Sequence, residues 1–403
     1  MTLITNKKTR ILVISHTFVQ PPVRDRWIQF SHDYPAQVRL VTPSIWSDSE
    51  YRSLAKFDAK NVESGSFSLT ALPTSTPGNH TRYLLKRLKK ELHEFKPDII
   101  YCVHEEFIWQ LHQTILYRYL FYPRARLLFF SMRKFPRTNP MRIKGIKSLI
   151  RNLYYLTLWC IVKTGTDGAL CHYPGIRAQM RSEGYKKPIK IGTQVGVNMS
   201  VFNKSSNTRE QIRNKLGLSG FVIGYCGRLI REKGVFDILR AANRLKVPWN
   251  LLLVGDGPAR EDFEKEISNL NLQNEVFITG RLPQQQIPSY FCAMDSFTIG
   301  SYETSEWIDT FPLVVAQAML MKLPIIGSTS GAIPFQLNGE GLSFNPGDVT
   351  QLAKHLKYLS ENPKEREIIG NRLFESAIDR FSTKALNNDL WQFFSELGSK
   401  NVI

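Results

Sequence analysis

A short segment in the second half of the chain places cations beside two glycines. It spans Gly227–Gly234, in the order Gly-Arg-Leu-Ile-Arg-Glu-Lys-Gly, and follows the apolar, strand-like run Phe221–Cys226. A helix is predicted directly after it, over Val235–Leu245. Cationic side chains and the free amides of a helix N-terminus both stabilise phosphate oxygens, so Arg228 and Lys233 suit a diphosphate. The motif alone is weak evidence, because an arginine at a strand end is often only solvated.

Three further segments follow in a fixed order. Two strand-like runs, Leu251–Val254 and Val276–Thr279, each lead into a glycine-containing turn. A third stretch, Ser301–Met319, carries an aspartate and, eight positions later, a glutamine. Together with the cationic segment, the series resembles the C-terminal domain of the glycosyltransferase family 4 enzymes, also called glycosyl transferases group 1. That family has the GT-B fold and retains the anomeric configuration of the sugar.

The resemblance implies how a nucleotide-sugar donor is held. In the family, the Gly-Arg…Lys-Gly element binds the donor diphosphate. Two glutamates, at the spacing of this aspartate and glutamine, contact the transferred sugar and the ribose, and amides between them meet the phosphates. The first of these positions is Asp309 here, which we predict to be catalytic. The predicted donor-binding residues are Gly227, Arg228, Lys233, Gly280, Arg281, Thr310, Phe311, Pro312, Leu313 and Gln317.

The chain departs from the family pattern at three positions of that loop. Asp309 keeps the charge of the first glutamate but is one methylene shorter. Gln317 keeps a hydrogen-bond acceptor for the ribose but loses the charge of the second. Pro312 stands where the family has glycine. The donor site is therefore implied, whereas the rate and the sugar preference stay open.

The first half contributes a histidine at a strand end. His104 follows the predicted strand Asp98–Val103 and is itself followed by Glu105 and Glu106. Many family members place a residue near the reacting sugar at this point, so we predict that His104 is catalytic, through proton transfer or a hydrogen bond to a sugar hydroxyl. A lone histidine after a strand is also often a structural residue. For His16 and His172 that structural interpretation is favoured.

Apolar runs alternate with longer amphipathic stretches along the chain, which is typical of parallel α/β sheets. We predict an α/β protein of the GT-B class, with two doubly wound Rossmann-like domains and a ligand-binding cleft between them. Residues 1–203 form the acceptor-side domain and residues 204–382 the nucleotide-sugar-binding domain. The last segment, about 383–403, is a helix expected to pack back on the first domain.

The segment Gln194–Phe202 resembles the family's linker-proximal Gly-Val-Asp…Phe signature, with Asn198 for the aspartate. Strands are predicted at Arg10–Ser15, Gln37–Thr42, Asp98–Val103, Arg126–Phe130, Gly168–Cys171, Ile189–Ile191, Phe221–Cys226, Asn250–Val254, Glu275–Thr279, Asp295–Ile299 and Pro324–Gly327.

Charge is distributed unevenly over the 403 residues. The net charge is +18, yet residues 1–215 carry 35 Lys and Arg against 14 Asp and Glu, and residues 216–403 carry 18 against 21. A basic half of this kind indicates a polyanionic partner. Two basic segments with apolar residues at helical spacing, Tyr83–His93 and Met141–Trp159, favour contact with an anionic membrane. The alternative is that both are core helices with solvated basic faces. No nucleic-acid recognition motif is present, so we expect no nucleic-acid partner.

The most favoured function is a retaining hexosyltransferase that uses a UDP- or GDP-sugar and a glycan or lipid-linked acceptor in polysaccharide or glycoconjugate synthesis. We expect no metal or other cofactor, because fixed cations serve the diphosphate and no Asp-x-Asp pair occurs. The scattered cysteines and the basic half predict a cytoplasmic protein in peripheral contact with the inner face of the membrane. Two alternatives stay open: a GT-B scaffold that has lost activity, and a nucleotide-sugar epimerase.

Overall fold

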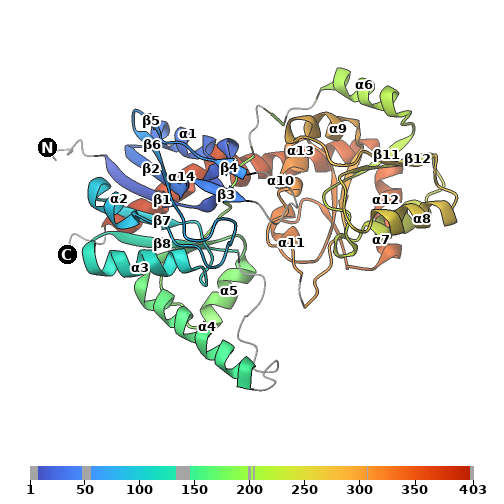
Figure 1. The fold of residues 1–403 in the computed structure, drawn as a ribbon. Coiled ribbons are helices and arrows are strands. Elements are labelled where there is room, and N and C mark those ends of the chain that lie inside the picture. The colour runs from blue at the N-terminus through green and yellow to red at the C-terminus, as the bar shows by residue number, and fades with distance from the viewer. Residues whose placement is uncertain are drawn as a thin grey trace. The chain divides into compact units, whose positions relative to one another are not determined.

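The computed structural model describes residues 8–47, 56–132, 146–197, 201–202, 205–305 and 307–399. The chain divides into two compact units (Figure 1). Unit 1 comprises Met1–Val195 and Leu386–Ile403, and unit 2 comprises Gly196–Ala385. The predicted boundaries, after residues 203 and 382, differ from these by eight and three residues. Asn198, from the linker signature, falls outside the described residues.

Unit 1 is built on an eight-stranded sheet with the order β10-β9-β8-β7-β1-β2-β6-β5. Only β5 runs antiparallel to its neighbour, and β3 and β4 pair separately. The inner strands are buried on both faces, and their sequences are accordingly apolar throughout. The strands are β1 (Thr9–Ile14), β2 (Ala36–Pro43), β3 (Ile45–Ser47), β4 (Lys56–Asp58), β5 (Val62–Ser64), β6 (Phe67–Leu72), β7 (Ile99–Cys102), β8 (Arg126–Ser131), β9 (Gly168–Cys171) and β10 (Ile189–Ile191). The helices are α1 (Asp25–Asp33), α2 (Leu88–Phe95), α3 (Trp109–Phe121), α4 (Ile146–Gly165), α5 (Pro174–Ser182) and most of α14 (Thr383–Ser399).

Helix α14 completes the core of unit 1 although it follows unit 2 in the chain. Its residues Leu390, Phe393 and Phe394 belong to the same buried cluster as Ile11 and Tyr101 of the sheet. The helix lies within the segment predicted to be helical, about 383–403.

The start of α14 is fixed by a half-buried arginine on α1. Arg26 Nε donates to Asn387 Oδ1 at 2.8 Å, and Arg26 also donates to the carbonyls of Thr193 and Gln194. Burial lowers the pKa of Arg26 to about 10. The guanidinium therefore joins the last strand region of unit 1 to its last helix.

Unit 2 is a second, smaller Rossmann-like unit. Its sheet has the order β13-β12-β11-β14-β15-β16, and all its strand pairs are parallel. The strands are β11 (Phe221–Cys226), β12 (Trp249–Val254), β13 (Val276–Ile278), β14 (Ser296–Ile299), β15 (Ile325–Ser328) and β16 (Leu342–Phe344). The helices are α6 (Ser206–Leu216), α7 (Val235–Ala242), α8 (Arg260–Asn269), α9 (Ile287–Ala293), α10 (Leu313–Leu320), α11 (Ile333–Leu337), α12 (Val349–Glu361) and α13 (Pro363–Phe381).

The two basic segments singled out in the sequence behave differently. On α2, the apolar residues Leu88, Leu92 and Phe95 are buried in the core of unit 1, so α2 is a core helix with an exposed basic face. On α4, by contrast, many apolar side chains are exposed. Residues 141–145 of the second segment lie outside the described residues. Among the described residues, no helix is both long enough and apolar enough to cross a bilayer.

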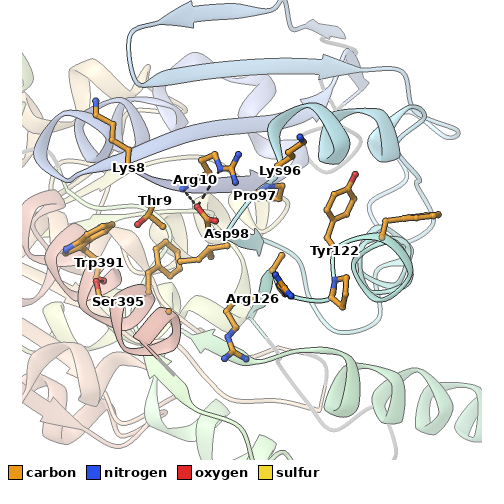
Figure 2. Close-up of a pocket in the computed structure, with 17 residues that line it drawn as sticks. Lys8, Thr9, Arg10, Lys96, Pro97, Asp98, Tyr122, Arg126, Trp391 and Ser395 are labelled. Atoms are coloured by element: carbon orange, nitrogen blue, oxygen red, sulfur yellow. Dashed lines mark hydrogen bonds and ion pairs between the residues drawn. The ribbon is translucent and has the colours of Figure 1, made fainter. Parts of the chain in front are cut away.

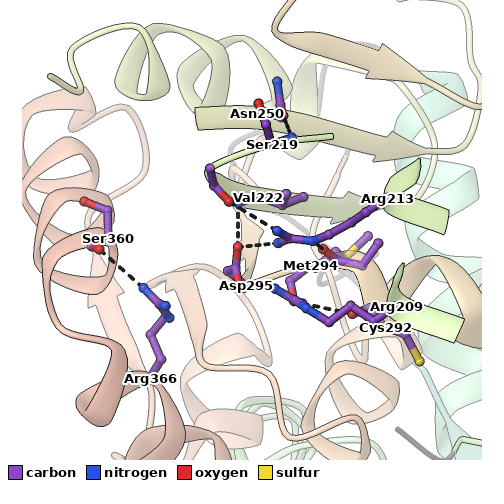
Figure 3. Close-up of polar contacts among 12 residues, drawn as sticks. Arg209, Arg213, Ser219, Val222, Asn250, Cys292, Met294, Asp295, Ser360 and Arg366 are labelled. Carbon is purple, nitrogen blue, oxygen red and sulfur yellow. Dashed lines mark hydrogen bonds and ion pairs between the residues drawn. The ribbon is translucent and has the colours of Figure 1, made fainter. Parts of the chain in front are cut away.

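One aspartate fastens α6 to the amino ends of the unit 2 strands (Figure 3). Asp295 accepts hydrogen bonds from Arg209 at 2.7 Å, from Arg213 at 2.6 Å and from the amide of Val222 at 2.8 Å. Arg209 also donates to the carbonyl of Cys292 at 3.0 Å. Burial by itself raises the pKa of Asp295, but Arg209 and the Val222 amide outweigh it and hold the pKa below its usual value.

We predict that Asp295→Ala lowers the free energy of unfolding by about 3 kcal/mol, because it leaves two partly buried arginines without their carboxylate. Since the folded pKa is depressed, the stabilisation is complete above the unfolded pKa of about 4 and is lost as the pH falls through the folded value. Denaturant unfolding at neutral and acidic pH measures both effects. The control is Asp389→Ala, whose ion pair with Lys190 is half exposed and should contribute about 1 kcal/mol or less. Equal losses in the two variants would contradict the prediction.

Candidate active site

Close contacts between backbones shape the carboxyl edge of the unit 2 sheet. A Cβ atom on Gly255, after β12, would lie 1.9 Å from the carbonyl oxygen of Gly227, after β11. Gly234 adopts a φ of +67°, and a Cβ there would lie 2.1 Å from the carbonyl oxygen of Gly300, after β14. Side chains are therefore excluded at both glycines. The three strand-end turns meet in one place, and Gly234 caps the N-terminus of α7 there.

An ion pair joins the turn after β11 to the loop after β14. Lys233 Nζ lies 2.8 Å from both carboxylate oxygens of Asp309. The two side chains are only 12% and 9% exposed. Ser301 Oγ donates to Asp309 Oδ2 at 2.5 Å, and Lys233 Nζ lies 5.6 Å from the centre of the Trp307 ring. The sequence assigned Lys233 to the diphosphate and Asp309 to the sugar, whereas in the structure the two side chains form one polar unit.

The backbone of Asp309 is held as firmly as its side chain. Its carbonyl oxygen accepts the amide of Ala332 at 2.8 Å. A Cβ on Gly331 would lie 2.2 Å from that oxygen, and Gly331 has a φ of +56°. The loop after β15 therefore presses on the loop that carries Asp309 and fixes the direction of its carboxylate.

Arg228 and Arg281 are exposed, and no side-chain hydrogen bond joins either to a described residue. The backbone next to Arg228 is nevertheless ordered, because Tyr225 Oη donates to the Arg228 carbonyl at 2.7 Å. Burial raises the pKa of Tyr225 well above its usual value; the charge on Asp309 raises it further and the charge on Arg228 lowers it. A neutral tyrosine hydroxyl thus lies within the field of both predicted site residues.

The loop that leads into α10 contributes less than the resemblance implied. Pro312 has no amide hydrogen, so it cannot donate to a phosphate as the predicted run of amides required. The Phe311 ring lies 5.4 Å from the Phe381 ring, which directs it toward the interior of unit 2. Thr310 and Leu313 are half-buried at the N-terminal end of α10. Gln317 lies on α10, only 4% exposed, and its side chain forms no hydrogen bond with the described residues.

Ser301 and Trp307 were not predicted as parts of the site. Both lie in the stretch Ser301–Met319, before Asp309, but no spacing rule connects a serine that follows β14 with a carboxylate eight residues later. The contact depends on how the intervening loop folds back on itself, where Thr304 donates its amide to the Trp307 carbonyl at 2.8 Å.

In unit 1, His104 is part of an aromatic cluster at the carboxyl ends of β1 and β7. His104 is 1% exposed, and its Nε2 forms a hydrogen bond with the hydroxyl of Tyr83. The His16 ring lies 5.9 Å from the His104 ring and 4.9 Å from the Trp46 ring. His80 Nδ1 lies 3.2 Å from His16 Nε2. His104 was predicted as a site residue and His16 as a structural one. No sequence motif predicted His80, Tyr83 or Trp46 as members of the cluster.

Burial lowers the pKa of two imidazoles of this cluster, His16 and His104. Burial and the nearby His80 lower the pKa of His16 to about 3. Burial, with a smaller contribution from His16, lowers the pKa of His104 well below its usual value. His104 Nδ1 and His16 Nδ1 are buried, and neither has a hydrogen-bond partner among the residues that the structure describes. A neutral ring with an unused nitrogen suits a hydrogen bond to a hydroxyl better than proton donation.

A pocket of about 830 Å³ lies at the opposite edge of the unit 1 sheet, where β1, β7 and β8 begin (Figure 2). Lys8, Arg10 and Arg126 line it, and Asp98 accepts the Arg10 amide at 2.8 Å. Ligands of open α/β sheets bind beyond the carboxyl ends of the strands. The pocket is therefore separate from the candidate active site.

Comparison with solved structures identifies the class of fold. Sucrose-phosphate synthase from Thermosynechococcus elongatus is similar over 98% of this chain and 100% of that one, with a TM-score of 0.71 and 18% identity. Anabaena Alr3699/HepE, solved in complex with UDP, is similar over 96% and 100%, with a TM-score of 0.70 and 18% identity. The predicted fold class, GT-B with two Rossmann-like units, is confirmed.

Sequence comparison finds a family match within unit 2. Residues 208–375, most of unit 2, match the family "Glycosyl transferases group 1". The predicted resemblance to the group 1 glycosyltransferases is thus confirmed over residues 208–375, and the assignment to family 4 stays a prediction.

Two relatives extend this match. The teichuronic acid biosynthesis glycosyltransferase TuaC of Bacillus subtilis, a putative assignment by its name, is 33% identical over 141 residues, covering 34% of this chain and a third (33%) of that protein. The lipopolysaccharide core biosynthesis glycosyltransferase LpsD of Rhizobium meliloti is 26% identical over 319 residues, covering 78% of this chain and 80% of that one.

We predict that Lys233→Met lowers the free energy of unfolding of the unliganded protein by about 3 kcal/mol, because the buried Asp309 carboxylate loses its counter-charge. The double variant Lys233→Met/Asp309→Leu should recover much of that loss, since no unpaired charge then stays buried. Thermal and denaturant unfolding of the four proteins of this cycle gives the coupling. Strictly additive effects would mean that the two side chains do not interact in solution.

Proposed function

We propose that the protein is a retaining hexosyltransferase that moves a sugar from a nucleotide-sugar, with UDP as the favoured nucleotide, to a glycan or lipid-linked acceptor. The observation that carries the proposal is the Lys233–Asp309–Ser301 cluster at the carboxyl edge of the unit 2 sheet. It lies within the segment that matches the group 1 glycosyltransferases. The names of TuaC and LpsD support a role in polysaccharide or glycoconjugate synthesis, and the UDP complex of HepE supports the nucleotide.

In this proposal, cations of the protein stabilise the departing diphosphate. Arg228 is exposed and unengaged by described side chains, so its guanidinium is available for a bidentate contact with phosphate oxygens. An ammonium has three N–H donors, so Lys233 keeps one for a phosphate oxygen even when two serve Asp309. Such preorganised charges act where negative charge develops in the transition state. A metal ion is not part of the proposal.

Asp309 is proposed to act on the transferred sugar through its charge. Its two oxygens are engaged by Lys233 and Ser301, which makes attack on the anomeric carbon unfavourable. Retention is therefore proposed to proceed by transfer on one face of the sugar, without a glycosyl-enzyme intermediate. His104 is proposed to hydrogen-bond a sugar hydroxyl with its buried, unused Nδ1.

We predict that Arg228→Ala weakens UDP binding about 10-fold, because a hydrogen bond to a charged group contributes roughly 1.5–3 kcal/mol. Isothermal titration of UDP measures the change. Arg231→Ala is the matched control: this exposed arginine, three positions further along, is paired with Asp262 and stacked on Phe236. Unchanged UDP affinity in Arg228→Ala would place the diphosphate elsewhere.

Substitutions of Asp309 and of Gln317 should affect different kinetic parameters. Asp309→Asn should lower kcat by roughly 100-fold, because it removes a charge that matters most in the oxocarbenium-like transition state. Gln317→Ala should mainly raise KM for the donor, since a ribose contact is similar in both states. Gln317→Glu should leave kcat unchanged. Transfer assays with a panel of nucleotide-sugars decide between these outcomes, and stabilisation by UDP confirms that each variant is folded.

One observation favours a second candidate function, a scaffold that has lost transfer activity. The carboxylate proposed to act on the sugar forms an ion pair with Lys233. If neither the wild type nor Gln317→Glu turns over any donor, while both bind UDP, the scaffold replaces the enzyme.

A further inference from the structure

Exposed apolar side chains concentrate on two helices of unit 1. Among the described residues, nineteen large apolar side chains are exposed, and twelve of them lie on α3 and α4. The two helices contact each other; Trp109 Nε1 of α3 donates to Tyr154 Oη of α4 at 2.9 Å. We call these twelve side chains the α3–α4 surface. They are Trp109, Leu116, Tyr119, Leu120, Phe121, Ile146, Leu149, Ile150, Leu153, Tyr154, Leu156 and Ile161.

Helix α4 has two apolar faces, and only one of them is used by the core. Trp159 and Val162 are buried against unit 1. Ile146, Ile150 and Leu153, at the i, i+4 and i+7 positions of another face, are 68%, 62% and 64% exposed. A surface helix normally carries polar residues on its solvent face. The core of unit 1 does not account for the apolar residues on the exposed face of α4, so this face is a candidate for binding a partner.

The sequence that forms this surface is strongly basic, although residues 133–145 of it lie outside the described part of the chain. Between Phe107 and Thr166 the sequence contains eleven Lys and Arg and no Asp or Glu. Basic side chains of α2 and of its C-cap residue border it as well: Lys89 Nζ lies 4.1 Å from the centre of the Phe121 ring, and Lys89, Lys90 and the C-cap Lys96 are exposed. Glu94 of α2, which pairs with Lys90, is an acid beside these cations. Apolar side chains bordered by an excess of cations match the acyl and anionic headgroup layers of a membrane.

We propose that the α3–α4 surface docks on an anionic lipid bilayer, with its apolar side chains inserted among the lipids and the flanking lysines and arginines on the headgroups. The inference rests on the membrane contact expected from the sequence and names the surface that makes it. A second copy of the chain fits less well, because it would bring the same positive charge to the interface. Nucleic acid fits less well, because phosphates do not cover apolar side chains.

The test uses the full chain and its own cysteine on α4. Cys160 is exposed, whereas the other four cysteines are buried. A polarity-sensitive fluorophore on Cys160 should shift its emission to the blue with phosphatidylcholine vesicles that contain phosphatidylglycerol, and much less with pure phosphatidylcholine or at high salt. A label at Ile368→Cys on α13, in a Cys160→Ser background, should not shift.

Three serine substitutions then test insertion. Ile146→Ser/Ile150→Ser/Leu153→Ser should lower the vesicle partition coefficient about 30-fold or more, since each side chain loses much of its burial energy. The matched control is Tyr358→Ser/Ile368→Ser, two exposed apolar residues of unit 2, which should bind vesicles as the wild type does. UDP-induced thermal stabilisation should be equal in all three proteins, so a failed membrane test is distinct from a failed donor site.

Three outcomes would overturn the proposal. Equal partitioning of the triple variant and the wild type would show that the apolar face does not insert. Binding to neutral vesicles as strong as to anionic ones would remove the role of the cations. Self-association that the serine substitutions abolish, without any vesicle binding, would assign the surface to a second copy.

Discussion

The buried contact between Lys233 and Asp309 is the interaction on which the candidate active site depends. Attraction between two charges is strong where water is excluded, but the same exclusion makes either charge costly alone. The pair therefore persists only because the surrounding backbone holds both residues in place. Gly234, Gly255 and Gly331 permit that approach by having no side chains. The turns after three separate strands thus hold one ion pair in place. Unit 2 therefore has a preorganised polar edge.

The two units divide their chemistry by charge state. Unit 2 presents fixed ions: an ion pair at its sheet edge and an exposed arginine beside it. Unit 1 presents neutral polar rings, because burial lowers the pKa of both His16 and His104 and so favours their uncharged forms. A nucleotide diphosphate needs the first kind of surface, and sugar hydroxyls are served by the second. The proposed transferase function follows from this division more than from any single residue.

Much of the fold could be predicted from the sequence, and the reason is physical. Strands such as Phe221–Cys226 and Gly168–Cys171 are buried on both faces, so an uninterrupted apolar run marks their full length. Strand β6 (Phe67–Leu72) was missed because it mixes serine and threonine with its apolar residues, and β5 because it is exposed. Site residues divide in the same manner. Those in local motifs, Arg228, Lys233 and Asp309, could be found, whereas Ser301, His80 and Trp46 reach the sites only through tertiary folding. The sequence also could not predict whether an amphipathic helix buries its apolar face. The segments of α2 and α4 both had the pattern of interfacial helices, and only the packing shows that α2 buries its apolar face.

The return of α14 to unit 1 also has a consequence for how the protein is made. During synthesis, the residues of unit 1 emerge first, but Leu390, Phe393, Phe394 and Leu397 are supplied only after all of unit 2 has been translated. Until then the apolar face of the unit 1 sheet is covered by α1 but lacks the side chains of α14. Unit 2, in contrast, is continuous in the chain and can fold as soon as it leaves the ribosome. The part of the protein encoded first is therefore the part that matures last, and chaperones would meet it in that unfinished state.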